Sequence, residues 1–200
     1  MLGPIMAIPL LLCLVAATST YDRLPNDAYP IKYSLTLRPD MKTFTYQGTL
    51  KITLVMNNTD EFYLNSEGLN ITDNQNGLMK GTEKLDYIGK QERNRFKVYT
   101  LETITPETSV DYTVDFKGDI RSDLSGFYRS SYIYNGNERF LASTQFENSG
   151  ARKAFPCFDE PSFRADFQLE LLPESGWSAI SNTPILSDTT TVGVRSIKFS

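Results

Sequence analysis

Histidine is absent from this 200-residue sequence, and cysteine occurs only twice, as Cys13 and Cys157. Without an imidazole nearby, a thiol lacks the usual base that turns it into a nucleophile. Cys13 falls in an apolar N-terminal run, so Cys157 has no disulfide partner in the rest of the chain. We therefore expect Cys157 to be a small buried hydrophobic residue between Pro156 and Phe158.

The sequence also lacks a basic excess and a long hydrophobic run. Its formal net charge is −4, so it lacks the excess of positive charge that is typical of proteins that bind nucleic acid. The apolar segment at residues 5–17 is shorter than the roughly 20 residues that a membrane helix needs. Small residues at Val15–Ala17 favour a signal peptide over residues 1–17, with Thr18 starting the mature chain. An uncleaved signal anchor is the alternative, although no basic residues flank the run.

No long helical pattern occurs, whereas alternation of apolar and polar residues predicts many short strands. The predicted strands are 31–38, 44–56, 96–101, 110–117, 165–171, 177–181 and 194–199, with a weaker one at 85–88 among loops. Asn135-Gly136 predicts a tight hairpin, because both central residues of the favoured turn need a positive φ. Gly48 interrupts an apolar face and predicts a bulge or a close backbone approach. The fold class is therefore all-β, as a sandwich or a large twisted sheet.

The stretch from Phe140 to Phe163 combines a strand, a helical turn and a charged corner. On the strand, side chains alternate, so Phe140, Ala142, Thr144 and Phe146 share one face, and Ser143, Gln145 and Glu147 share the other. Asn148 and Ser149 are candidate caps for a brief helix over 151–155, which Pro156 ends.

This stretch resembles the N-terminal domain of the zinc aminopeptidases of the aminopeptidase N type, the gluzincin aminopeptidases. The likeness rests on TQFENSGARKAFPCFDEPSF at 144–163, and on the segments RLP at 23–25, YPIKYSL at 29–35 and GFYRSS at 126–131. It covers nearly the whole chain after residue 20. It implies a saddle-like β domain over residues 18–200 that is truncated inside its C-terminal end.

The resemblance implies that Glu147 helps hold the free α-amino group of a peptide substrate and that Gln145 lines the first side-chain pocket. By composition alone, Glu147 is an ordinary solvent-facing carboxylate. The family's zinc site needs H-E-x-x-H on a helix, which a chain without histidine cannot form. The family's G-A-M-E-N stretch is missing too. We therefore expect this chain to bind no cofactor and to be inactive alone, while the full-length relative uses zinc and reaches peptide substrates through a catalytic domain.

Arg152, Asp159 and Glu160 form a charged corner, which we interpret as an ion-paired structural turn because nothing in the sequence indicates shifted carboxyl pKa values. Asn57 and Asn70 begin N-x-Thr acceptor triplets and are candidate glycosylation sites. With the apolar leader, they predict the secretory pathway and an extracellular or cell-surface location. Membrane attachment through a C-terminal region outside this chain stays open.

Two rival functions follow from the same residues. The chain could be a free-standing secreted β module, a non-catalytic relative that binds peptides or regulates. A sugar-binding sandwich ranks last, because the aromatic residues fall on the apolar faces and are better explained as core.

Overall fold

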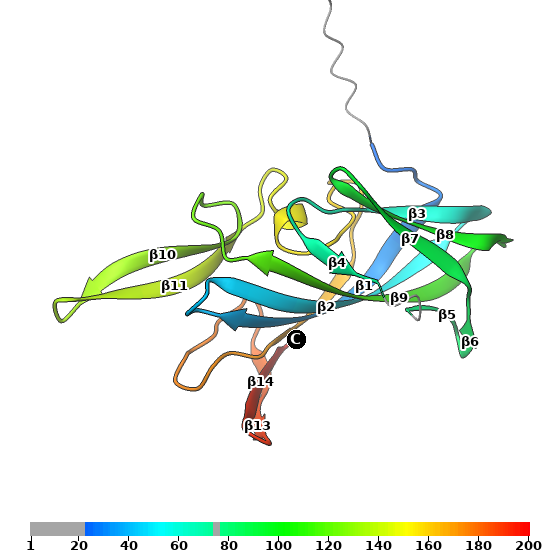
Figure 1. The fold of residues 1–200 in the computed structure, drawn as a ribbon. Coiled ribbons are helices and arrows are strands. Elements are labelled where there is room, and N and C mark those ends of the chain that lie inside the picture. The colour runs from blue at the N-terminus through cyan, green and yellow to red at the C-terminus, as the bar shows by residue number, and fades with distance from the viewer. Residues whose placement is uncertain (1–22, 74–76) are drawn as a thin grey trace, which may run out of the picture.

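The computed structural model describes residues 23–73 and 77–200, which form a chain of strands with one short helix (Figure 1). The expected signal peptide at 1–17, its boundary at Thr18 and Cys13 lie outside these residues. The elements are β1 (Ala28–Asp40), β2 (Thr45–Met56), β3 (Thr59–Asn65), β4 (Asn70–Thr72), β5 (Leu78–Lys80), β6 (Glu83–Lys84), β7 (Tyr87–Glu92), β8 (Arg95–Ile104), β9 (Thr108–Asp119), β10 (Gly126–Tyr134), β11 (Asn137–Gln145), η1 (Ala151–Lys153), β12 (Asp166–Leu171), β13 (Ile185–Thr191) and β14 (Val194–Phe199).

The strands form three sheets of different size. The main sheet has the order β13-β14-β12-β1-β2-β9-β5-β6, and β4 also pairs with β9. Within it, β1 pairs antiparallel with β2 and parallel with β12. A second sheet has the order β3-β8-β7, and β10 and β11 form a separate hairpin that projects from the body (Figure 1). The predicted all-β class, with twisted sheets and one helical turn near 150–156, is confirmed.

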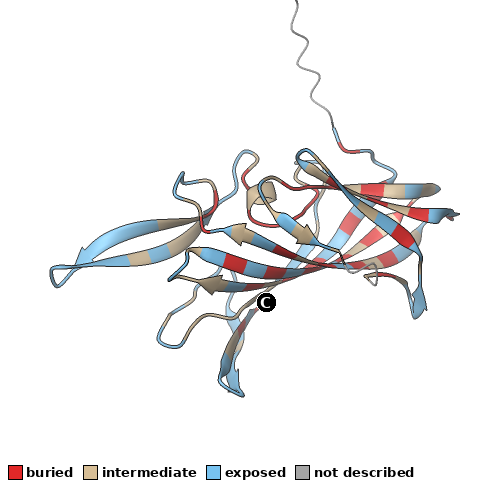
Figure 2. Ribbon diagram, viewed as in Figure 1, coloured by how far each residue is buried: buried red, intermediate tan, exposed pale blue. Residues whose placement is uncertain are grey.

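The core lies between the main sheet and the β3-β8-β7 sheet. Leu50, Ile52 and Leu54 of β2 are fully buried, while the residues between them are partly or fully exposed. Strands of the second sheet contribute buried Leu64 and Val98 from the opposite side. Figure 2 shows this pattern as alternating buried and exposed bands along the central strands. The apolar alternation in the sequence therefore corresponds to one face of a half-covered sheet.

The hairpin signal is confirmed in detail. β10 and β11 pair from Tyr134 and Asn137 at the tip to Gly126 and Gln145 at the root. Asn135 has φ 50° and Gly136 has φ 75°, as a two-residue turn of the favoured kind requires. The root is fixed to the main sheet, because the Phe127 ring of β10 meets the Tyr46 ring of β2 edge to face at 5.1 Å. The turn therefore sets the register that brings Gln145 to the base of the hairpin.

Gly48 does not make the predicted bulge. The pairing of β2 with both neighbours is regular through this residue, and the irregularity of β1 lies between Pro30 and Lys32. A Cβ atom at Gly48 would lie 2.2 Å from Cζ of Phe116. The glycine is needed because the buried Phe116 ring of β9 lies over it, so the close approach involves a side chain and not a backbone.

Other local predictions are wrong. Residues 177–181 form no strand, and the weak strand expected at 85–88 lies at Tyr87–Glu92. The strands β3, β4, β5, β6 and β13 were not predicted. The helix after β11 is a single 3-10 turn, Ala151–Lys153, whose N-cap is Gly150, and no side chain caps it. β1 also continues through Pro39 to Asp40, and the turn follows it, closed by the Asp40 carboxylate accepting the Lys42 N–H at 2.9 Å.

Candidate functional site

The end of β11 presents two polar side chains at the root of the hairpin. Gln145 is the last residue of β11, and Glu147 follows in the turn before η1. Both are exposed, and the Gln145 position pairs with Gly126 of β10. The carboxylate and the amide are therefore available to a ligand while the backbone that carries them belongs to a paired strand.

A large hollow lies on the other side of this strand end. It has a volume of about 1180 Å³ and is bounded by β1, β12, the segment after β11 and the loop before β13. Thr144, Phe146 and Asn148 line it, whereas Gln145 and Glu147 do not. The predicted alternation of side chains thus holds at the strand end. Thr144 and Phe146 lie on the face opposite Gln145 and Glu147, but they are exposed and not part of the core. Ser143 was expected on the same face as Gln145 and Glu147. It lines the hollow, which they do not, so this part of the prediction is wrong.

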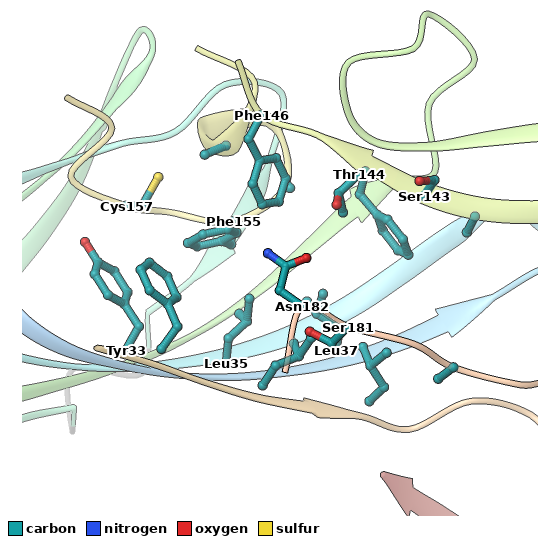
Figure 3. Close-up of a pocket in the computed structure, with 18 of the residues that line it drawn as sticks. Tyr33, Leu35, Leu37, Ser143, Thr144, Phe146, Phe155, Cys157, Ser181 and Asn182 are labelled. Carbon is teal, nitrogen blue, oxygen red and sulfur yellow. The ribbon is translucent and has the colours of Figure 1, made fainter. Parts of the chain in front are cut away.

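Aromatic side chains form much of the hollow wall (Figure 3). The rings of Tyr33 and Phe167 are stacked at 4.5 Å, and Phe155 meets both of them edge to face. Phe146 packs on Phe155 at 5.8 Å, and Asn182 of the loop before β13 extends into the space (Figure 3). This wall suits apolar contact more than proton transfer, and it is separate from the polar strand end.

The segment that follows Glu147 is anchored through an ion pair. Nε of Arg152 donates to Oδ2 of Asp159 at 2.7 Å, and the guanidinium also donates to the Asp159 carbonyl at 2.9 Å. Both side chains are largely buried, with 17% and 13% exposed. Glu160 does not join this pair. Its Oε1 instead accepts the backbone N–H of Leu24 at 2.6 Å, which ties the N-terminal arm to the corner.

Two further anchors were not identified from the sequence. Asn65, at the end of β3, exchanges backbone hydrogen bonds with Cys157, and its side-chain oxygen accepts the Asp159 N–H at 3.1 Å. The Tyr46 hydroxyl donates to the Ala154 carbonyl at 2.7 Å. These partners are about 90 or more residues apart in the chain. No local pattern in the sequence marks such pairs.

Buried hydroxyl and thiol groups near the corner stay neutral. Burial, and then the neighbouring Cys157, raises the pKa of Tyr33, whose hydroxyl accepts the Phe158 N–H at 3.1 Å. Burial, and then the Asp159 charge, raises the pKa of the Cys157 thiol well above its ordinary value. A thiol that resists ionisation is a poor nucleophile. The expectation that Cys157 is a buried hydrophobic residue is confirmed.

Metal-binding side chains are not gathered anywhere in the part of the chain that the structure describes, since no group of three or more His, Cys, Asp or Glu residues could hold an ion. The residues present therefore do not fit a zinc site. In the described ranges, no helix is both long and apolar enough to cross a bilayer.

Comparison with known proteins covers almost the whole described chain. Residues 29–200 match the Peptidase M1 N-terminal domain family. The alanine/arginine aminopeptidase of Saccharomyces cerevisiae is 32% identical over 186 residues, which is 88% of this chain and 21% of the yeast protein. Endoplasmic reticulum aminopeptidase 1 of Homo sapiens is 35% identical over 176 residues, which is 84% of this chain and 18% of the human protein. The chain thus spans about a fifth of the length of these relatives.

The expected location, in the secretory pathway and extracellular or at the cell surface, is contradicted by the relatives. Aminopeptidase 2, mitochondrial, of Saccharomyces cerevisiae is 31% identical over 180 residues, or 88% of this chain and 19% of that protein. Proteins named for the mitochondrion and for the endoplasmic reticulum share this domain, so the presence of the domain does not indicate a cell-surface location. Glycosylation of Asn57 and Asn70 stays a prediction. Asn70 is exposed, whereas the Asn57 side chain accepts the Glu107 N–H at 3.0 Å.

Proposed function

Because this chain belongs to the Peptidase M1 N-terminal domain family, we propose that it forms the N-terminal β domain of a zinc aminopeptidase that releases N-terminal amino acids from peptides. The observation that carries the proposal is the end of β11. Gln145 and Glu147 are exposed there, beside a corner that Arg152 and Asp159 hold in place. An exposed polar pair on a rigid support is what a substrate contact requires.

Glu147 binds the free α-amino group of the peptide in this proposal. A carboxylate and an ammonium make a charge-assisted hydrogen bond, which is stronger than a neutral one once water is excluded. The exposed position of Glu147 in the described chain supports the proposal, because a second domain closing over the strand end would supply the exclusion of water. The contact selects substrates with an unblocked amino terminus.

Zinc and its ligands come from a catalytic domain, because a chain without histidine has no imidazole to offer. Zinc bound in such a domain would supply Lewis-acid chemistry. We expect the 200-residue chain to retain no stoichiometric zinc after dialysis and to release no amino acid from an aminoacyl substrate. Metal analysis and a turnover assay check this, and one tightly held zinc per chain with turnover contradicts the domain assignment.

Gln145 lines the pocket for the first side chain in this proposal. In a full-length aminopeptidase that carries this domain, we expect Gln145→Ala to change which N-terminal residues are accepted. A neutral hydrogen bond contributes about 0.5–1.5 kcal/mol, so individual substrates should change about two- to tenfold in kcat/KM. A panel of aminoacyl substrates measures the change. A uniform loss across the panel would place Gln145 outside the pocket.

The reading frame beyond Ser200 tests the assignment as an enzyme domain. Sequencing of the transcript is expected to reveal a frame that continues to G-A-M-E-N and to H-E-x-x-H. A stop codon directly after Ser200 in every transcript would instead support a non-catalytic module that binds peptides.

A further inference from the structure

A second cavity, of about 680 Å³, is built on the outer face of the main sheet, where β1 and β2 meet the β13–β14 hairpin (Figure 1). Leu37 and Tyr46 are buried on the core face of these strands, whereas Arg38 and Gln47 are exposed on the outer face. Arg38 and Gln47 also lie directly opposite each other in the pairing of β1 with β2. The cavity is lined by residues 38–40, 45–47, 172–175, 190 and 193–195.

The walls of this cavity are tied to the sheet and to each other. On one side, the N–H of Leu172 donates to the carbonyl of Leu37 at 2.8 Å, which holds the segment after β12 beside the end of β1. On the other side, Arg195 of β14 donates to both carboxylate oxygens of Asp188 and to the carbonyl of Trp177, at 2.6–2.9 Å. The Arg195 charge is therefore compensated within the wall, and it is not available to a ligand.

The cavity carries charges of both signs that do not pair with each other. The Arg38 side chain is exposed, and it makes no ion pair or side-chain hydrogen bond with the residues that the structure describes. Asp40 lies two residues further along the same face of β1, and the N–H groups of Lys42 and Thr43 donate to its Oδ1. These hydrogen bonds lower the pKa of Asp40, so its carboxylate stays charged. Glu174 adds a second carboxylate from the wall after β12.

A guanidinium beside carboxylates on one cavity wall matches the charges of a zwitterion. Guanidinium groups bind carboxylates through two parallel hydrogen bonds, and carboxylates accept charge-assisted hydrogen bonds from ammonium groups. Residues two apart on one face of a strand are about 7 Å apart, so the two charged groups of one α-amino acid can reach Arg38 and Asp40 together. Pro39, Leu172 and Val194 line the same cavity and suit an apolar side chain on the ligand.

We propose that this cavity binds a free α-amino acid with an apolar side chain. Arg38 binds the carboxylate of the amino acid, and the Gln47 amide, directly opposite Arg38, donates a further hydrogen bond to it. Asp40 and Glu174 accept hydrogen bonds from the ammonium group. The proposal does not depend on the role proposed for Glu147, because the hairpin that leads to Glu147 packs on the other face of the main sheet.

Titration of the 200-residue chain with L-leucine, followed through backbone N–H chemical shifts, tests the proposal. Two matched probes each lack one charged group: 4-methylpentanoate has no amino group, and 3-methylbutylamine has no carboxylate. Two charge-assisted contacts are consistent with a Kd of about 1 mM for L-leucine. We expect saturable shift changes that gather at residues 38–47, 172–175 and 190–195, and binding that is about tenfold or more weaker for either probe.

Arg38→Met removes the guanidinium and keeps an apolar stem. Because Arg38 is exposed, this variant should fold and should bind L-leucine about 10- to 100-fold more weakly. Lys32→Met is the matched control, since it removes another exposed cation from β1 about 20 Å away, outside the cavity. Lys32→Met should bind L-leucine as wild type does.

Glu174→Gln provides a second test that does not depend on how Arg38→Met folds. It removes one partly exposed carboxylate, so L-leucine should bind about two- to fivefold more weakly and 4-methylpentanoate should be unaffected. Each of three results overturns the proposal: no saturable binding of L-leucine, equal affinity for L-leucine and 4-methylpentanoate, or unchanged L-leucine affinity in a folded Arg38→Met variant. Equal weakening of both ligands by Glu174→Gln also contradicts it.

Discussion

Replacement of Glu147 by alanine is expected to lower kcat/KM roughly thirtyfold or more in a full-length aminopeptidase that carries this domain. Loss of one partner from a buried charged pair typically costs about 2–5 kcal/mol, and about 1.4 kcal/mol corresponds to a tenfold change. The loss should occur without unfolding, because the Glu147 side chain is exposed in the described domain. Steady-state kinetics on an N-terminal aminoacyl substrate measure it.

Two control variants accompany Glu147→Ala. Glu138→Ala removes another exposed carboxylate from β11, near the hairpin tip, and Ser143→Ala removes a hydroxyl that faces the hollow. Both should retain nearly wild-type kcat/KM. If Glu147→Ala also folds and retains wild-type kcat/KM, then Glu147 is a solvent-facing residue and the role given to this strand end is wrong.

Replacement of Asp159 by alanine is expected to destabilise the 200-residue chain by about 3 kcal/mol or more. The Asp159 carboxylate contacts the Arg152 side chain and accepts its backbone N–H at 3.3 Å. Loss of one member of a buried pair typically costs about 3–5 kcal/mol, because the remaining charge is less well compensated. These side chains are largely and not fully buried, so the lower end of that range applies. Urea unfolding measures the change.

The pair Arg121 and Asp123 provides a matched control for Asp159→Ala. It also joins an arginine and an aspartate close in sequence, here through two hydrogen bonds from the guanidinium to the carboxylate, but 31% and 49% of the side chains are exposed. Exposed pairs contribute about 0–1 kcal/mol, so Asp123→Ala should barely change the urea midpoint. Equal destabilisation by the two substitutions would show that the Arg152 corner is not a special anchor.

The regular strands of the fold could be predicted because apolar residues recur at every second position in their sequence. β2 and β9 bury alternate residues against the core, so their apolar pattern is visible in the sequence. β13 could not be predicted, since it lies at the sheet edge and is exposed on both faces except at Ser187. The parallel pairing of β1 with β12 joins residues more than 130 apart, which no local pattern reports.

Prediction of the candidate site was less complete. Gln145 and Glu147 were identified through the family resemblance, and their exposure was expected from strand alternation. The residues that anchor the segment after them, such as Asn65 and Tyr46, become visible only when distant segments are packed together.

The most direct test of the account measures the preference for a free amino terminus. Matched competitive inhibitors with and without an α-amino group are compared on full-length wild type and on Glu147→Gln, which removes the charge and keeps the shape. The account predicts that wild type prefers the amine-bearing inhibitor and that Glu147→Gln loses most of this preference. An unchanged preference in the folded variant would contradict the assignment of Glu147 to the substrate's amino group.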